Sequence, residues 1–131
     1  MDKKFFDTDI TGKIIGCAMK VHTELGCGFQ EVIYQRSLEI ELQDANIPFS
    51  REHDMPIYYK GKPVGLRRVD FLIDSEISVE LKALTILEKV HFVQATNYLE
   101  AYNLKTGLLI NFGAPSLQFH RLTKKKYKPN L

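Results

Sequence analysis

Two neighbouring segments of the chain alternate apolar and other side chains with a period of two. The alternate apolar positions are Val69, Phe71 and Ile73 in the first segment, and Ile77, Val79, Leu81 and Ala83 in the second. Because successive side chains of a β-strand point to opposite faces, each segment predicts a strand with one purely apolar face. The intervening residues, Asp-Ser-Glu, are typical of a turn, so the pattern predicts an antiparallel hairpin.

The register of this hairpin follows from the same alternation. A three-residue loop pairs Ile73 with Ile77, and counting back along both strands then pairs Asp70 with Glu80. A slip of one residue would bring the apolar face of one strand onto the polar side of the other, which leaves about two acceptable registers. In the favoured register the carboxylates of Asp70 and Glu80 are cross-strand neighbours, and Lys82 lies one step along on the same face.

This arrangement needs a positive charge, because two adjacent carboxylates repel each other and the sheet gains no stability from them. Lys82 by itself is one candidate, as a salt-bridge partner. The other is a hard divalent cation such as Mg²⁺, which takes oxygen ligands from carboxylates and keeps several waters. The alternation alone leaves both interpretations open.

The remaining elements predict an α/β fold. Apolar residues at helical spacing predict a helix capped by Thr8 or Asp9 and ended at Gly26, and a second helix over residues 29–45. Residues 49–60 predict a strand, residues 61–63 a turn, and the next strand begins near Val64. A third helix over residues 87–103 leads to an apolar strand that begins near Gly107, and residues 117–122 are a candidate edge strand. The order of elements indicates a mixed sheet flanked by helices.

Length and composition indicate one globular domain. The chain has 131 residues, of which 44% are hydrophobic and 26% charged, and we expect a single domain over residues 1–131 with a basic tail at 124–131. No segment approaches the roughly 20 apolar residues of a membrane span, and the N-terminal residues do not resemble a signal peptide. We therefore expect a cytoplasmic protein with reduced cysteines. The net charge of +2 is too small to indicate nucleic-acid binding by itself.

Three further groups of polar residues are candidates for a site. Glu31 lies one turn before Tyr34 on the inward-facing stripe of the second helix, so it either joins the acidic pair or stabilises the helix N-terminus. On the third helix, Gln94 and Tyr98 lie on a polar face that is either solvated or in contact with a nucleotide. The basic tail is either a solvated end or a phosphate contact, through Lys124, Lys125 and Lys126.

Several of these residues also form known motifs. Residues 28–34, GFQEVIY, spell the signature GxxExxY, and nearly the whole chain resembles the family of that name, a branch of the PD-(D/E)xK nuclease superfamily. Asp70 is similar to the aspartate of the superfamily, residues 79–82 to its ExK element, and residues 94–98 to the QxxxY element of RecB-type nucleases. Val69 stands where the superfamily's name has proline. The resemblance implies a restriction-endonuclease-like core.

This resemblance also implies a chemistry, the hydrolysis of phosphodiester bonds in DNA or RNA. Asp70, Glu80 and the backbone carbonyl of Leu81 would hold Mg²⁺ or Mn²⁺, with Glu31 as a direct or water-mediated ligand. Lys82 would act beside the two acids, by positioning the attacking water or stabilising charge in the transition state. The neighbouring acids favour its ammonium form, which argues against a role as a base.

The same resemblance suggests the partners. We expect contacts to nucleic acid, DNA more than RNA, at Tyr34, Gln94 and Tyr98 and at the tail lysines Lys124, Lys125 and Lys126. A homodimer is expected from the habits of small enzymes in this superfamily. The alternative is a catalytically silent nucleic-acid-binding or regulatory module of the same fold, although the chain keeps every ionisable residue of the site.

Overall fold

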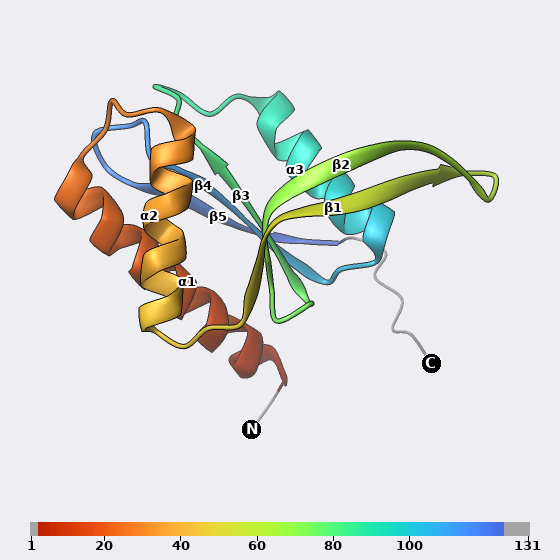
Figure 1. Cartoon of the computed structure of the whole chain (residues 1–131), viewed down its shortest axis with the longest axis horizontal. Coiled ribbons are helices and arrows are strands. Elements are labelled where there is room, and N and C mark those ends of the chain that lie inside the picture. Colours follow the sequence, from red (N-terminus) through yellow and green to blue (C-terminus); the bar gives the residue numbers. More distant parts are fainter. Residues whose placement is uncertain (1–2, 125–131) are drawn as a thin grey trace.

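The computed structural model describes residues 3–124, with side chains from residue 10 onward. It confirms the predicted α/β class and order of elements, including the edge strand at the end (Figure 1). The elements are α1 (Lys3–Leu25), α2 (Glu31–Asp44), β1 (Phe49–Tyr59), β2 (Lys62–Ile73), β3 (Ile77–Lys82), α3 (Lys89–Tyr102), β4 (Thr106–Asn111) and β5 (Gln118–Thr123).

The five strands form one mixed sheet in the order β1-β2-β3-β4-β5. Only the β3–β4 pair is parallel, and α3 makes the crossover between them. Helices α1 and α2 cover one face of the sheet, and α3 covers the other (Figure 1). Strand β4 is therefore buried from both sides, as its continuous apolar sequence predicts.

The predicted register of the β2–β3 hairpin is confirmed. Ile73 pairs with Ile77 and Phe71 with Val79, and all four side chains are buried. The β1–β2 turn is tighter than predicted, because Lys60 and Gly61 both adopt positive φ, at 51° and 76°. These values suit the two-residue turn that joins twisted strands, so β2 begins at Lys62 and not near Val64.

The predicted beginning of the first helix is wrong. Helix α1 starts at Lys3, so Thr8 and Asp9 lie inside it and do not cap it. A cap contributes only about 1 kcal/mol, and no glycine or proline in residues 3–9 forces the helix to end there. Among the described residues, no helix is long and apolar enough to cross a membrane.

The segment that follows β3 is held in place by one buried amide. The side chain of Asn111 is fully buried, and its Oδ1 accepts hydrogen bonds from the backbone of Leu84 at 2.8 Å and Gly113 at 3.1 Å. Its Nδ2 donates to the carbonyl of Leu84 at 2.8 Å. This clasp fixes the chain immediately beyond Lys82, which is the register partner of Asn111.

Gly113→Ala should destabilise the protein, because the new Cβ would overlap the backbone of Leu84 and push the clasp apart. We expect a loss of roughly 3 kcal/mol in the free energy of unfolding, measured by urea denaturation. Gly65→Ala is the matched control, since open space surrounds that position and the change should stay within about 1 kcal/mol. Equal stability of the two variants would contradict this role for Gly113.

Candidate functional site

The site forms where β2 separates from β3. Their pairing ends at Phe71 and Val79, after which β2 continues with β1 while β3 continues with β4. At this fork the carboxylate of Asp70 replaces a backbone carbonyl as the hydrogen-bond acceptor. Its Oδ2 accepts the N–H of Leu81 at 2.7 Å. The hydrogen bond both satisfies a strand N–H and holds Asp70 against the end of β3.

A chain of polar side chains holds the other oxygen of Asp70. Buried Gln35 on α2 donates its Nε2 to Asp70 Oδ1 at 2.9 Å. The Gln35 Oε1 accepts from Arg51 at 3.2 Å, and Arg51 pairs with Glu39 at 2.9 Å. Burial raises the pKa of Asp70, and the hydrogen bonds from Leu81 and Gln35 oppose that rise. The network therefore favours an ionised Asp70 in a fixed orientation.

Glu80 lies next to Asp70 in a less favourable environment. Among the described residues, its Oε1 is the one buried side-chain oxygen or nitrogen without a hydrogen-bond partner. Burial, followed by the charge of Asp70, raises the pKa of Glu80 to about 8. An acid that is desolvated next to a second acid has its charged form disfavoured unless a cation joins it.

Lys82 supplies one positive charge to all the acids. Its charge lowers the pKa of Glu31, of Asp70 and of Glu80, each against the larger effect of burial. Glu31 is the first residue of α2 and is exposed, so it does not continue the buried stripe as predicted. It nevertheless lies close enough to Asp70 for that charge to raise its pKa. Glu31 is thus both a helix N-terminal acid and a neighbour of the site.

The three acids are neighbours but do not form a finished metal site. Within residues 10–124, whose side chains are described, no three acidic, histidine or cysteine side chains are placed closely enough to hold an ion together. The donor chemistry nevertheless fits a hard cation such as Mg²⁺, which prefers carboxylate and carbonyl oxygens. An ionised carboxylate has about four lone-pair sites, so Asp70 keeps acceptor capacity beyond its two hydrogen bonds. The unpaired, buried Oε1 of Glu80 also fits such a group.

Tyr34 occupies a different place from the one predicted for a nucleic-acid contact. Its side chain is fully buried, and its ring stacks on Phe112 with centroids 4.7 Å apart. The hydroxyl donates to the carbonyl of Gly26 at 2.6 Å and accepts from the backbone of Phe29 at 3.2 Å. The tyrosine of the signature therefore fixes the loop before α2, and with it the position of Glu31. This correction follows from its burial, which periodicity had already indicated.

Gln94 and Tyr98 on helix α3 are also more buried than the residues of a solvated face would be. Tyr98 is buried, accepts a hydrogen bond from Arg67 Nε at 2.9 Å and carries the Arg67 guanidinium 4.6 Å above its ring. Burial and the charge of Glu80 raise the pKa of Tyr98, which places its hydroxyl near the site. Gln94 is half-buried, and its contact with nucleic acid stays a prediction.

Only one of the three tail lysines predicted to contact phosphate lies within the described residues. Lys124 donates its Nζ to Asn103 at 3.0 Å, while Lys125 and Lys126 lie outside the described residues. Sequence reasoning missed Gln35, Arg51 and Arg67, although Gln35 directly follows the GxxExxY signature. No periodicity signals such residues, because their partners lie on other elements.

Comparison with known proteins identifies the family and the fold. The family model described as the PD-(D/E)XK nuclease superfamily matches residues 8–122. No curated protein matches the chain. The crystal structure of SSO0001 is similar in fold, with a TM-score of 0.56 and 20% sequence identity over 72% of this chain. This chain spans only 50% of the length of SSO0001.

Gln35→Met should raise the pKa of Asp70 further, because it removes a hydrogen bond that stabilises the ionised carboxylate. The titration of the Asp70 carboxyl carbon, followed by NMR, measures this change. Gln43→Met is the control, since Gln43 is exposed on the same helix. An unchanged Asp70 titration in Gln35→Met would show that the amide does not orient this acid.

Glu80 predicts how stability depends on pH when no divalent cation is present. Its pKa is about 8 in the folded protein against an ordinary value of 4.5, so the folded state binds more protons between these values. The free energy of unfolding therefore falls as pH rises through this window. Glu80→Gln removes the titration, and relative to wild type it should gain a few kcal/mol at about pH 9 and almost nothing at about pH 4.

Urea unfolding with a chelator, repeated across this pH range, tests the Glu80 prediction. Glu76→Gln, in the exposed turn between β2 and β3, is the control for the loss of one carboxylate. A difference between Glu80→Gln and wild type that stays constant with pH would mean that burial does not keep this carboxyl group neutral.

Proposed function

Because this chain belongs to the PD-(D/E)XK nuclease superfamily, we propose that it is a metal-dependent phosphodiesterase that cleaves nucleic acid, DNA in preference to RNA. One observation carries the proposal. At the fork, Asp70 and Glu80 lie together beside Lys82, and a buried oxygen of Glu80 has no partner among the described residues. A sheet has no structural use for two desolvated acids side by side, whereas a cation-dependent hydrolase does.

Asp70, Glu80 and the backbone carbonyl of Leu81 would hold Mg²⁺ or Mn²⁺, with Glu31 as a direct or water-mediated ligand. The chemistry that such a cation supplies is polarisation of a phosphoryl oxygen and easier ionisation of water. Asp70 is oriented for this task by Leu81 and Gln35, at 2.7 and 2.9 Å. Glu80 must lose its proton to act as a ligand, and a nearby cation would lower its pKa.

Lys82 has the task of stabilising negative charge. It is half-buried and close enough to three acids to lower the pKa of each. An ammonium group can hold the attacking water by hydrogen bonding or stabilise the charge that develops on the phosphate. It is not suited to accept a proton from that water.

A catalytically silent nucleic-acid-binding module is the second candidate. It is favoured by the finding that the described residues contain no ready-made group of three metal ligands. In this case Lys82 would only compensate the charge of Asp70, and Glu80 would stay protonated at neutral pH. Cation binding and catalysis separate the two candidates.

Mg²⁺ or Mn²⁺ should stabilise the folded protein, because the ligands come together only in that state. At a concentration a hundredfold above the Kd, we expect the Tm to rise by roughly 5 to 10 °C. Asp70→Asn should remove most of this shift, while Asp74→Asn, in the exposed turn, should retain it. A wild-type protein without any shift would exclude the metal site.

Cleavage of labelled single-stranded, duplex and branched DNA tests the enzyme itself. Asp70→Asn and Lys82→Ala should lose cleavage while circular dichroism shows an intact fold, and Asp74→Asn should cleave as wild type does. Cleavage by Lys82→Ala at the wild-type rate would reject the role given to that residue. Cation binding without any cleavage would favour the silent module.

A further inference from the structure

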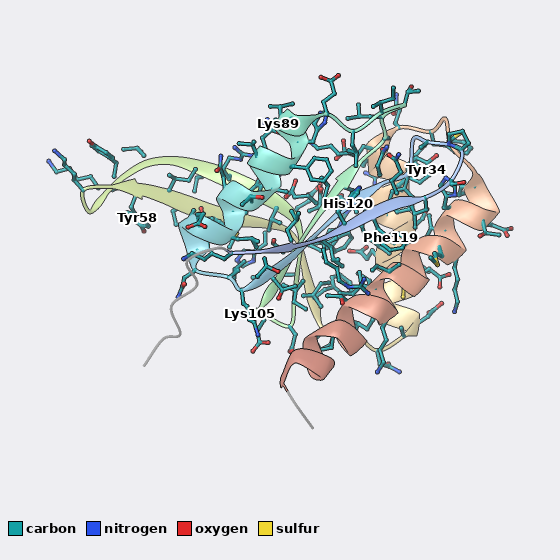
Figure 2. All side chains as sticks on the ribbon, turned by 180° about the vertical axis from the view of Figure 1, so that it is seen from behind. Tyr34, Tyr58, Lys89, Lys105, Phe119 and His120 are labelled. Atoms are coloured by element: carbon teal, nitrogen blue, oxygen red, sulfur yellow. The ribbon has the colours of Figure 1, made fainter. Side chains whose placement is uncertain are left out.

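Beyond the fork, β1 and β2 extend as a two-stranded arm, with which no other strand in residues 3–124 pairs (Figure 1). Four large side chains near its end are open to solvent: Tyr58 (61%), Tyr59 (64%), Val64 (62%) and Leu66 (68%). Figure 2 shows Tyr58 far out along the arm. We call residues 58–66 the arm tip. Its apolar and aromatic side chains contribute nothing to the core of this chain.

The arm is held firmly at its base by α3. Tyr102 donates its hydroxyl to the carbonyl of Pro56 at 2.7 Å, and Tyr98 is bound by Arg67 from β2. Met55 and Val69 are buried against the same helix. The tight turn at Lys60 and Gly61 closes the far end. The tip therefore has a set position relative to the site.

The charge at the far end of the arm is one-sided. Residues 57–69 contain four cations, Lys60, Lys62, Arg67 and Arg68, and no acid, while Glu52 and Asp54 lie nearer the base of the arm. Arg67 binds Tyr98, and Arg68 pairs with Asp54 at 2.8 Å, so both arginines serve the arm itself. Lys60 and Lys62 are exposed at the turn, and Lys60 lies 5.6 Å from the ring centre of Tyr59.

We propose that the arm tip binds a single-stranded nucleic-acid segment that flanks the bond cleaved at the fork, an inference that rests on the proposed function. Lys60 and Lys62 contact phosphates, and the rings of Tyr58 and Tyr59 offer surfaces on which unpaired bases stack. A polyanion is attracted by this tip, whereas a second copy of the same tip would bring like charges together. This charge pattern selects nucleic acid over self-association.

The spacing along β2 sets the length of the segment. Asp70 at the fork and Lys62 at the tip are separated by eight residues, which at roughly 3.3 Å per residue span about 26 Å. A strand with the rise of duplex DNA, about 3.4 Å per nucleotide, spans this distance with roughly eight nucleotides, and a more extended single strand needs fewer. Oligonucleotides longer than about eight nucleotides reach both places, so affinity should step up at or below this length.

Fluorescence anisotropy with labelled single-stranded DNA, in chelator so that no cleavage occurs, tests the tip. Combining Tyr58→Ala with Tyr59→Ala should weaken binding of a probe of about 20 nucleotides by at least tenfold.

Combining Lys60→Ala with Lys62→Ala should also reduce the salt dependence of binding, by about 1.4 in the slope of log affinity against log salt. In both double variants the step in affinity with probe length should disappear. Lys20→Ala with Arg36→Ala, on exposed positions of α1 and α2, is the control.

The outcomes separate this proposal from the proposed function. Tip variants that bind as wild type does, and that keep the step in affinity with probe length, overturn the proposal even if the wild type cleaves DNA. Tip variants that change only the molecular mass by light scattering also overturn it, since the tip would then be a self-association surface. Loss of binding in the tip variants supports it, and if the wild type then cleaves nothing, only the proposed function fails.

Discussion

The hydrogen bond from the N–H of Leu81 to the carboxylate of Asp70 is the interaction on which the rest of the structure depends. Without a side-chain acceptor, the separation of β2 from β3 would leave a strand N–H unpaired in a half-buried place, which costs about 1–3 kcal/mol. With it, β2 is free to leave the sheet and form the arm, while β3 continues along β4. The same contact that permits the fork places an acid at the end of β3.

The site combines rigidity with electrostatic cost. Asp70 is held by Leu81 and Gln35, whereas Glu80 next to it is desolvated and keeps its proton to about pH 8. Lys82 offsets part of this cost through its effect on both acids. Two adjacent carboxyl groups whose pKa values are both raised by burial are typical of a functional site, because stability alone would favour apolar side chains there.

Helix α3 connects the site with the arm. Its inner face packs on the sheet through Ala95 and Leu99, and Tyr98 links it to Arg67 on β2. The ring of Tyr98 lies beneath a cation and its hydroxyl lies near Glu80, so one side chain contacts the base of the arm and borders the acids. The packing of α3 on the sheet therefore sets the position of the arm relative to the acids.

The sequence by itself determined the order of elements, the β2–β3 register and the cross-strand proximity of Asp70 and Glu80, because a period of two with one apolar face admits few registers. Tertiary structure alone decided that the Tyr34 hydroxyl binds the loop before α2, that Glu31 lies exposed at the rim, and that Gln35 and Arg51 orient Asp70. Periodicity shows which face of its own element a side chain occupies. It contains no information on the distance to a side chain of another element, which depends on how the helices pack and where the strands part.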